Sequence, residues 1–200
     1  MLNWVLLLGG STGHGAATAK RLAKDGYGII AFHFDRGEAK KIAEHVISYG
    51  HQKLAIIAGL KAGNDRAKER ILGIKDAVKE NPDTKIVTIE QCKYSFTEAG
   101  AALDRILSVH KSPSAIICTS DVIAVGAMLR AKELNLRIPN DFSITGFDDI
   151  NLAQVVTAGL TTVRVPQQEM GQKAAKVLLD LINPNLDVSK SPSQELMTTI

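Results

Sequence analysis

Residues 113–150 read PSAIICTSDVIAVGAMLRAKELNLRIPNDFSITGFDDI and are the most informative about the fold class. It contains two short apolar runs, Ala115–Thr119 and Phe142–Gly146. Short apolar runs of this kind are typical of strands buried on both faces of a parallel sheet. Neighbouring parallel strands need a long crossover, usually a helix, so the residues between the two runs are predicted to be helical. The stretch therefore predicts a strand–helix–strand unit.

The same alternation continues toward both ends of the chain. Four further apolar runs are predicted strands: Trp4–Leu8, Gly28–Phe34, Leu54–Ala58 and Lys85–Ile89. Four apolar stripes with helical spacing mark helices: Ile42, Val46 and Ile47; Ile71, Ile74 and Val78; Leu103, Ile106 and Leu107; and Met170, Ala174, Val177, Leu178 and Leu181. We therefore predict an α/β fold, a three-layer α/β/α sandwich around a mainly parallel, doubly wound sheet.

Local signals place some of the element ends. Asn64-Asp65 offers a cap for the start of a helix, and Asn81-Pro82 stops that helix. The stretch Asn183–Ser193 is rich in Asn, Pro and Ser and is predicted to be a loop. A last short strand is predicted over Glu195–Ile200.

Composition and charge narrow the classes of function. The chain has 45% hydrophobic and 22% charged residues, which is ordinary for a globular protein and argues against disorder. Lys+Arg 24 against Asp+Glu 21 gives a net charge of +3, and the two signs are interspersed, so charge does not indicate a nucleic-acid partner. The five histidines share no spacing that suggests a metal site, and we predict none.

Apolar runs and cysteines indicate the compartment. No apolar run approaches the roughly 18–20 residues that cross a bilayer. Met1–Gly10 leads directly into a glycine turn, which indicates a first strand and not a signal peptide. Cys92 and Cys118 lie beside or within predicted strands, so we expect buried thiols and no disulfide. These features predict a cytoplasmic protein.

A glycine-rich turn follows the first predicted strand and opens the next helix. Glycines at such a turn allow close backbone approach to a pyrophosphate, which would then face the free N–H groups of a helix N-terminus. The run LLLGGSTGHGAATAKRLAKDGYGIIAFHFD, residues 6–35, resembles the Rossmann-like opening of short-chain dehydrogenases/reductases. The resemblance implies a site for NAD or NADP, with Asp35 favouring NAD and Arg36 leaving room for NADP. The implied cofactor-binding residues are Gly9, Ser11, Gly13, Gly15, Asp35 and Arg36.

The alternative is a tight turn kept for packing, with no cofactor bound. The catalytic Tyr-x-x-x-Lys pair of that family stands late in the chain. Tyr49-Gly-His-Gln-Lys53 has the same spacing but falls far too early, at a helix end before a strand, so we treat it as a coincidence. We assign no catalytic residue, because without a correctly placed Tyr/Lys/Ser set no side chain can donate a proton to the substrate carbonyl.

From residue 38 onward four blocks resemble another family. They read AEHVISYGHQKLAIIAG, NDRAKERILGIKDAV, PSAIICTSDVIAVGAMLRAKELNLRIPNDFSITGFDDI and LTTVRVPQQEMGQKAAKVLLDLI. In order and spacing they resemble the effector-binding lobe of lactose/galactose-repressor-type (LacI/GalR) proteins. The resemblance implies a periplasmic-binding-protein-like fold, in which two α/β lobes close on a sugar or another small polar effector.

The resemblance also implies ligand-binding residues. Arg70 stands where the family has an arginine that grips the effector, and a guanidinium fork suits such contacts. Asp148 stands where a carboxylate accepts from ligand hydroxyls, and Tyr94 where an aromatic ring stacks. Ser120 replaces a frequent Asn, which puts that contact in doubt. Each has a plainer alternative: a solvated Arg70, Asp148 capping a turn, Tyr94 on the rim, and Ser120 as a helix N-cap.

The two resemblances conflict, and we hypothesise a chimera, natural or engineered. A dehydrogenase-like unit, residues 1–36, would join a repressor-type lobe, residues 37–200, in a single merged globular domain. Such a domain would be non-catalytic, with weak or no effector binding because most of the first lobe is missing. The alternatives are an NAD(P)-binding protein or vestigial oxidoreductase, and a designed protein that only folds.

Partners follow from the same hypothesis. We expect a possible small polar ligand, no membrane, and a monomer or homodimer. No helix pair or basic arm suited to reading DNA is present, so no nucleic-acid binding is expected.

Overall fold

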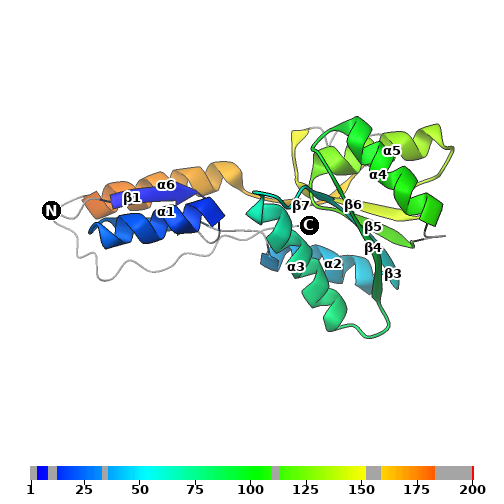
Figure 1. Cartoon of the computed structure of the whole chain (residues 1–200), viewed down its shortest axis with the longest axis horizontal. Helices are drawn as coiled ribbons and strands as arrows, with labels where there is room; N and C mark the ends of the chain where they lie inside the picture. Colours follow the sequence, from blue (N-terminus) through cyan, green and yellow to red (C-terminus); the bar gives the residue numbers. More distant parts are fainter. Residues whose placement is uncertain (1–3, 9–12, 33–35, 110–112, 152–158, 183–199) are drawn as a thin grey trace. The chain divides into compact units, whose positions relative to one another are not determined.

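The computed structural model describes the chain except residues 1–3, 9–12, 33–35, 110–112, 152–158 and 183–199 (Figure 1). The chain forms two compact units. The first combines residues 1–34 with residues 166–198, and the second consists of residues 35–165 with residues 199–200. Residues 166–198, which the sequence grouped with the second part, thus belong to the first. The merging of both parts into one domain stays a prediction.

The first unit is built on one parallel strand pair. β1 (Trp4–Leu8) and β2 (Gly28–Phe32) pair in register, and α1 (Gly13–Lys24) connects them. α6 (Gln167–Ile182) contacts both strands. A two-stranded pair has too little apolar surface to be stable alone, so α6 supplies packing that the N-terminal segment lacks. This return of α6 explains why the first unit is discontinuous in sequence.

The second unit contains a five-stranded sheet in the order β4-β3-β5-β6-β7. Its strands are β3 (Lys53–Gly59), β4 (Lys85–Cys92), β5 (Ala115–Cys118), β6 (Ser143–Asp148) and β7 (Thr161–Arg164). Every described strand pair in both sheets is parallel. The predicted α/β fold with a mainly parallel sheet is therefore confirmed.

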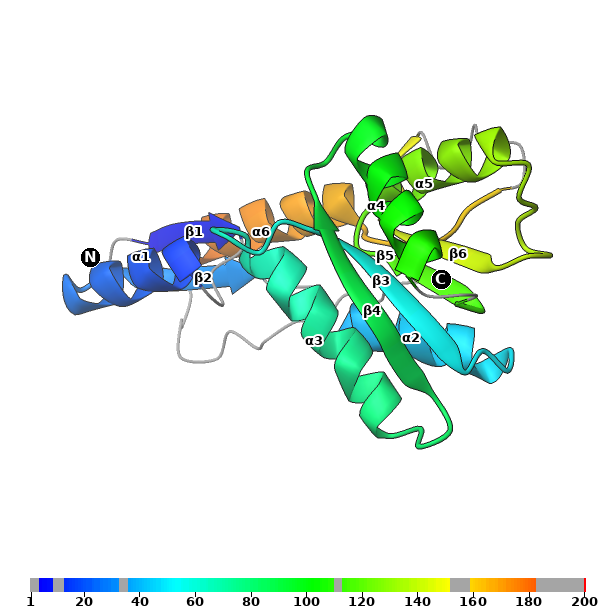
Figure 2. The same ribbon diagram turned by 45° about the vertical axis from the view of Figure 1, so that its right-hand side comes forward.

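Helices cover both faces of this sheet, as the layered prediction requires (Figures 1 and 2). They are α2 (Arg36–Ser48) and α3 (Asp65–Lys79) on one face, and α4 (Phe96–Val109) and α5 (Asp121–Glu133) on the other. Successive side chains of β3 serve the two cores in turn, since Ile56 packs with α2 and α3 and Ile57 with α4 and α5. Burial on both faces explains why the strands are continuous apolar runs.

The helix pair α2 and α3 approaches closely at Gly73. A Cβ atom added there would meet the carbonyl oxygen of Arg36 and would stand 2.9 Å from the amide nitrogen of Lys40. The absence of a side chain at Gly73 is thus what lets the two helices touch.

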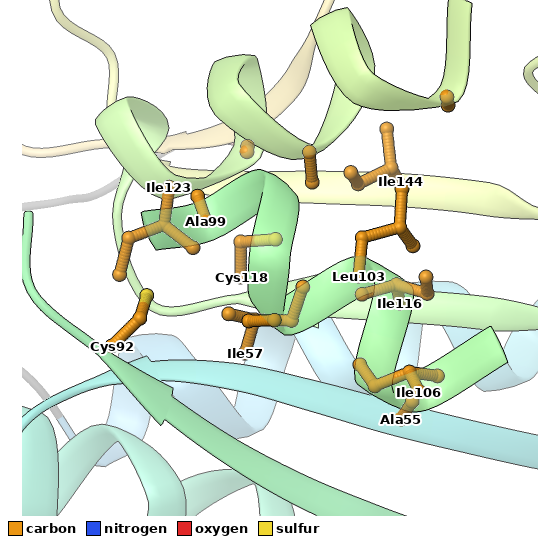
Figure 3. Packing of buried hydrophobic residues seen from close by; sticks show 14 of the residues in the cluster. Ala55, Ile57, Cys92, Ala99, Leu103, Ile106, Ile116, Cys118, Ile123 and Ile144 are labelled. Atoms are coloured by element: carbon orange, nitrogen blue, oxygen red, sulfur yellow. The ribbon is translucent and has the colours of Figure 1, made fainter. Parts of the chain in front are cut away.

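Both cysteines are buried free thiols, as predicted. Cys118 lies with Ile116, Ile57 and Leu103 in the core between the sheet and α4 and α5, where Cys92 also contributes (Figure 3). Burial raises the pKa of the Cys92 thiol to about 11 and also raises that of Cys118. Both sulfurs therefore act as small apolar groups at neutral pH.

Most predicted element ends lie within a few residues of the structure. Asn64 caps α3, because its side-chain oxygen accepts from the amide of Ala67 at 3.1 Å. The sequence missed β7, a four-residue strand with the single fully apolar residue Val163. Phe34, the end of the predicted strand Gly28–Phe34, lies outside the described residues, and so do residues 195–199 of the predicted last strand.

Candidate functional site

The candidate site lies at the carboxyl edge of the five-stranded sheet. The chain adds β4 on one side of β3 and then β5, β6 and β7 on the other, so the strand order reverses between β3 and β5. Ligands of open α/β sheets bind at such a reversal, beyond the carboxyl ends of the strands. Here Thr119 links the two strand ends, because its hydroxyl accepts from the amide of Gly59 at 3.2 Å.

Arg70 reaches this edge from α3 and is buried, with 3% of its surface exposed. Its Nη1 donates to the carbonyl oxygen of Thr119 at 2.7 Å and to Oδ2 of Asp148 at 3.2 Å. Its Nη2 donates to Oδ1 of Asp148 at 2.7 Å. The guanidinium carbon also lies 3.8 Å from the ring centroid of Phe147. The alternative of a solvated Arg70 is therefore wrong.

Asp148 is the last residue of β6 and has φ of +109°, a region that glycine prefers. The next residue, Asp149, has φ of +50°. Non-glycine residues held in such conformations cluster at functional sites, where the surroundings enforce them. The Asp148 side chain keeps 18% exposure, and Nη2 of Arg66 lies 3.4 Å from its Oδ1. A carboxylate that is oriented by arginines and still reachable from solvent can accept hydrogen bonds from a ligand.

Tyr94 follows β4 and is 49% exposed. Its hydroxyl accepts from Nδ2 of Asn64 at 2.9 Å. A Cβ atom added at Gly59 would meet the Tyr94 ring, so the ring lies directly on the end of β3. Asn64 thus both caps α3 and orients Tyr94. The sequence identified the cap, but the contact with Tyr94 joins residues that are distant in the chain and gave no local signal.

Ser120 stands at the N-cap position of α5, but its side chain makes no capping hydrogen bond. The predicted N-cap position of Ser120 is therefore confirmed, without a hydrogen bond from its side chain. The neighbouring Asp121 is fully buried and accepts from the amide of Ile150 at 2.8 Å and from the Thr162 hydroxyl at 2.5 Å. Burial raises the pKa of the Asp121 carboxyl, while these two hydrogen bonds lower it. Asp121 connects α5 to β7 and to the chain after β6.

β1 ends before the glycine-rich run, and α1 begins within it, at Gly13. Gly13 and Gly15 form the first turn of α1, whereas Gly9, Ser11 and Asp35 lie outside the described residues. Arg36 begins α2 in the other unit, and its Nε donates to Oδ2 of Asp76 at 2.8 Å. The structure thus gives Arg36 a protein partner, and the dinucleotide site stays a prediction.

Over the described ranges, no group of three or more His, Cys, Asp or Glu side chains is placed to hold a metal ion. None of the helices in the described part of the chain has the length and hydropathy needed to cross a membrane.

The strand reversal, the pair of buried Arg70 and partly exposed Asp148, and the nearby Tyr94 are typical of an α/β protein that binds small ligands at its sheet edge. The model of the periplasmic binding protein-like domain family matches residues 43–200, and the chain belongs to that family. The resemblance of the later blocks to repressor effector-binding lobes is confirmed.

Two curated relatives illustrate the likeness. The HTH-type transcriptional repressor PurR of Vibrio vulnificus is 36% identical over 140 residues, which are 70% of this chain and 42% of that protein. The ribose operon repressor of Haemophilus influenzae is 36% identical over 146 residues, again 70% of this chain and 42% of that protein. The chain thus spans about four-tenths of the length of these relatives.

A solved structure extends the likeness to nearly the whole chain. The sugar-binding transcriptional regulator of the LacI family from Escherichia coli, complexed with phosphate, matches with a TM-score of 0.84 at 19% identity. The match covers 98% of this chain and 74% of that one, and it shows the fold alone. The dehydrogenase resemblance of residues 1–36 is not shown by these comparisons, and the chimera stays a hypothesis.

Proposed function

We propose that this chain is a non-catalytic effector-binding module of a transcription-regulator-type protein, and that it binds a small polar molecule such as a sugar at the carboxyl edge of the five-stranded sheet. The observation that carries the proposal is the bidentate pair of Arg70 and Asp148. A buried guanidinium that fixes a partly exposed carboxylate is costly to maintain for stability alone. Its place at the strand reversal favours a binding role.

The chemistry of the site suits a ligand with hydroxyl groups and one flat apolar face. Asp148, oriented by Arg70, presents carboxylate oxygens that accept from hydroxyls. Tyr94 offers a half-exposed ring on which a sugar face can stack, and Asn64 fixes its hydroxyl. Ser120 follows β5 at the same carboxyl edge of the sheet, and its side chain makes no capping hydrogen bond.

The relatives support a regulatory role. One is named a repressor of the ribose operon, and another an HTH-type transcriptional repressor. We propose that this chain alone binds its ligand weakly. Its first unit has one described strand pair, compared with five strands in the second, so it offers fewer contacts to a ligand. A cytoplasmic location and a monomer or homodimer stay predictions, as does the chimeric origin.

A dinucleotide site in the first unit is a second candidate. It is favoured by the parallel β1–α1–β2 arrangement, with Gly13 at the first residue of α1. Calorimetric titration with NAD and NADP, and with a Gly13→Val variant, tests it separately. Binding that survives Gly13→Val would remove the glycine turn from this candidate.

The effector site is tested by calorimetric titration of the whole chain with ribose, galactose, glucose and hypoxanthine. Asp148→Asn removes the charge with little change of shape, and we expect at least about tenfold weaker binding of whichever compound binds, since hydrogen bonds to charged groups contribute about 1.5–3 kcal/mol. Asp149→Asn is the matched control, because Asp149 instead lies 3.4 Å from Nε of Arg164. Equal losses in both variants, or an unaffected Asp148→Asn, would contradict the proposed site.

A further inference from the structure

Asp121, the first residue of α5, has a fully buried side chain. Its Oδ2 accepts from the amide of Ile150 at 2.8 Å, and its Oδ1 accepts from the Thr162 hydroxyl at 2.5 Å. Both carboxylate oxygens thus bind groups outside α5. An aspartate that only stabilised the start of its helix would face the free amides of that helix. The side chain of Asp121 therefore has a role beyond its own helix.

The hydrogen bond to Ile150 holds the chain directly after an unusual turn. Asp148 and Asp149 have φ of +109° and +50°. Residues other than glycine rarely adopt such conformations, which persist only where the surroundings enforce them. Before the turn, the chain is held by the pairing of β6 with β7, and after the turn it is held by Asp121. Asp121 thus fixes one end of the turn that carries Asp148.

The same carboxylate lies directly on β6. A Cβ atom added at Gly146 would meet Oδ1 of Asp121, so the absence of a side chain there leaves room for the carboxylate. Gly146 also pairs with Thr162 across the two strands. Burial raises the pKa of Asp121, and the negative charge of Asp148 raises it further. The two carboxylates therefore repel each other, which favours the pairing of Asp148 with Arg70.

A buried carboxylate is costly unless its hydrogen bonds offset the loss of water. Here those hydrogen bonds fix the chain next to the proposed ligand contact. We propose that Asp121 is a positioning residue of the effector site: together with Thr162, it holds the chain after β6 so that Asp148 presents its carboxylate to the ligand. This inference rests on the proposed function. The role requires an oxygen that accepts from the Ile150 amide, and it does not require a negative charge.

Two substitutions of Asp121, studied in the full chain, test this role without a ligand. Asp121→Ala removes both acceptors, whereas Asp121→Asn keeps an oxygen that can accept from the Ile150 amide. In a crystal structure of Asp121→Ala, Asp148 is expected to leave the positive φ region and to lose its hydrogen bond to Nη2 of Arg70. In Asp121→Asn, both features are expected to remain. An Asp148 that keeps both features in Asp121→Ala would overturn the proposal.

Calorimetric titration with ribose, galactose, glucose and hypoxanthine measures the effect on binding. For whichever compound binds, we expect about tenfold weaker affinity in Asp121→Ala and a change of less than about threefold in Asp121→Asn. Leu103→Ala, in the core beside α4, is the control for a general loss of stability and is expected to keep the native affinity. Equal losses in Asp121→Ala and Leu103→Ala would contradict a positioning role. If none of the four compounds binds, the proposed function fails for them, while the ligand-free structures still decide the role of Asp121.

Thr162 offers a second test that does not depend on Asp121→Ala being folded. Thr162→Val keeps the branched shape and removes the hydroxyl that donates to Asp121, whereas Thr162→Ser keeps that hydroxyl. We expect about threefold weaker binding and a longer hydrogen bond from the Ile150 amide to Asp121 in Thr162→Val, and native values of both in Thr162→Ser. Native values of both in Thr162→Val would also overturn the proposal.

Discussion

Replacing Arg70 by Met tests the central contact of the effector site. Methionine keeps much of the side-chain volume but removes both hydrogen bonds to Asp148 and the one to the Thr119 carbonyl. The Asp148 carboxylate, at 18% exposure, then keeps only the longer contact with Nη2 of Arg66, at 3.4 Å, of its two arginine contacts. Removing one partner of a buried ion pair costs about 3–5 kcal/mol. We expect about 3 kcal/mol, the lower end of that range, because Asp148 keeps some contact with water.

Thermal and urea unfolding, followed by circular dichroism, measure this loss. For a chain of this size the loss corresponds to a fall in Tm of about 6–12 °C. The double variant Arg70→Met/Asp148→Asn is expected to regain part of the stability, because it removes the partly buried charge that Arg70 no longer balances. Arg36→Met is the matched control. It breaks the ion pair with Asp76, in which both side chains are more than one-third exposed, so little change is expected.

A small effect would contradict the structural reasoning. If Arg70→Met lowered stability by less than about 1 kcal/mol, as for a surface ion pair, Arg70 would not be the buried partner of Asp148. The same conclusion would follow if the double variant were no more stable than Arg70→Met.

Two further predictions concern packing and pH. Gly73→Ala places a Cβ against the Arg36 carbonyl, so urea unfolding should show a loss of about 1–3 kcal/mol, whereas Gly37→Ala, where nothing lies within 4 Å, should change little. Burial raises the pKa of Asp121 in the folded state, so protonation of this carboxyl favours folding. The resulting contribution to the free energy of unfolding is complete below the unfolded pKa of 3.8 and is lost as pH rises through the folded pKa. Urea midpoints measured from pH 3.5 to 7 should therefore fall for the native chain relative to Asp121→Asn; parallel profiles would exclude Asp121 as the cause.

The sequence predicts the layers of this fold well because its strands are buried on both faces. Continuous apolar runs such as Leu54–Ala58 and Ala115–Thr119 are typical of strands covered on both faces. The structure places Leu54–Ala58 in β3 and residues 115–118 in β5. The sequence did not predict β7, because the burial of this strand results from its pairing with β6 and its four residues show no apolar run.

The sequence indicated residues of the candidate site, but it did not predict how their side chains pair. Resemblance indicated Arg70 and Asp148, but their bidentate pairing joins α3 to the end of β6 across 78 positions of sequence. Nothing local indicates that Asp148 adopts φ of +109°. Nothing local indicates the ion pair of Arg36 with Asp76 either, because Asp76 lies 40 positions away in the sequence. Tertiary contacts decide what such long polar side chains do.

The discontinuous first unit has a consequence for synthesis on the ribosome. β1, α1 and β2 are translated before residues 35–165, whereas α6, which packs on them, is translated only after those residues. At about 5–20 residues per second that delay is on the order of ten seconds. During this time the nascent strand pair lacks its covering helix, while the five-stranded sheet can already close. Chaperones that shield apolar nascent segments are therefore expected to bind β1 and β2 during this interval.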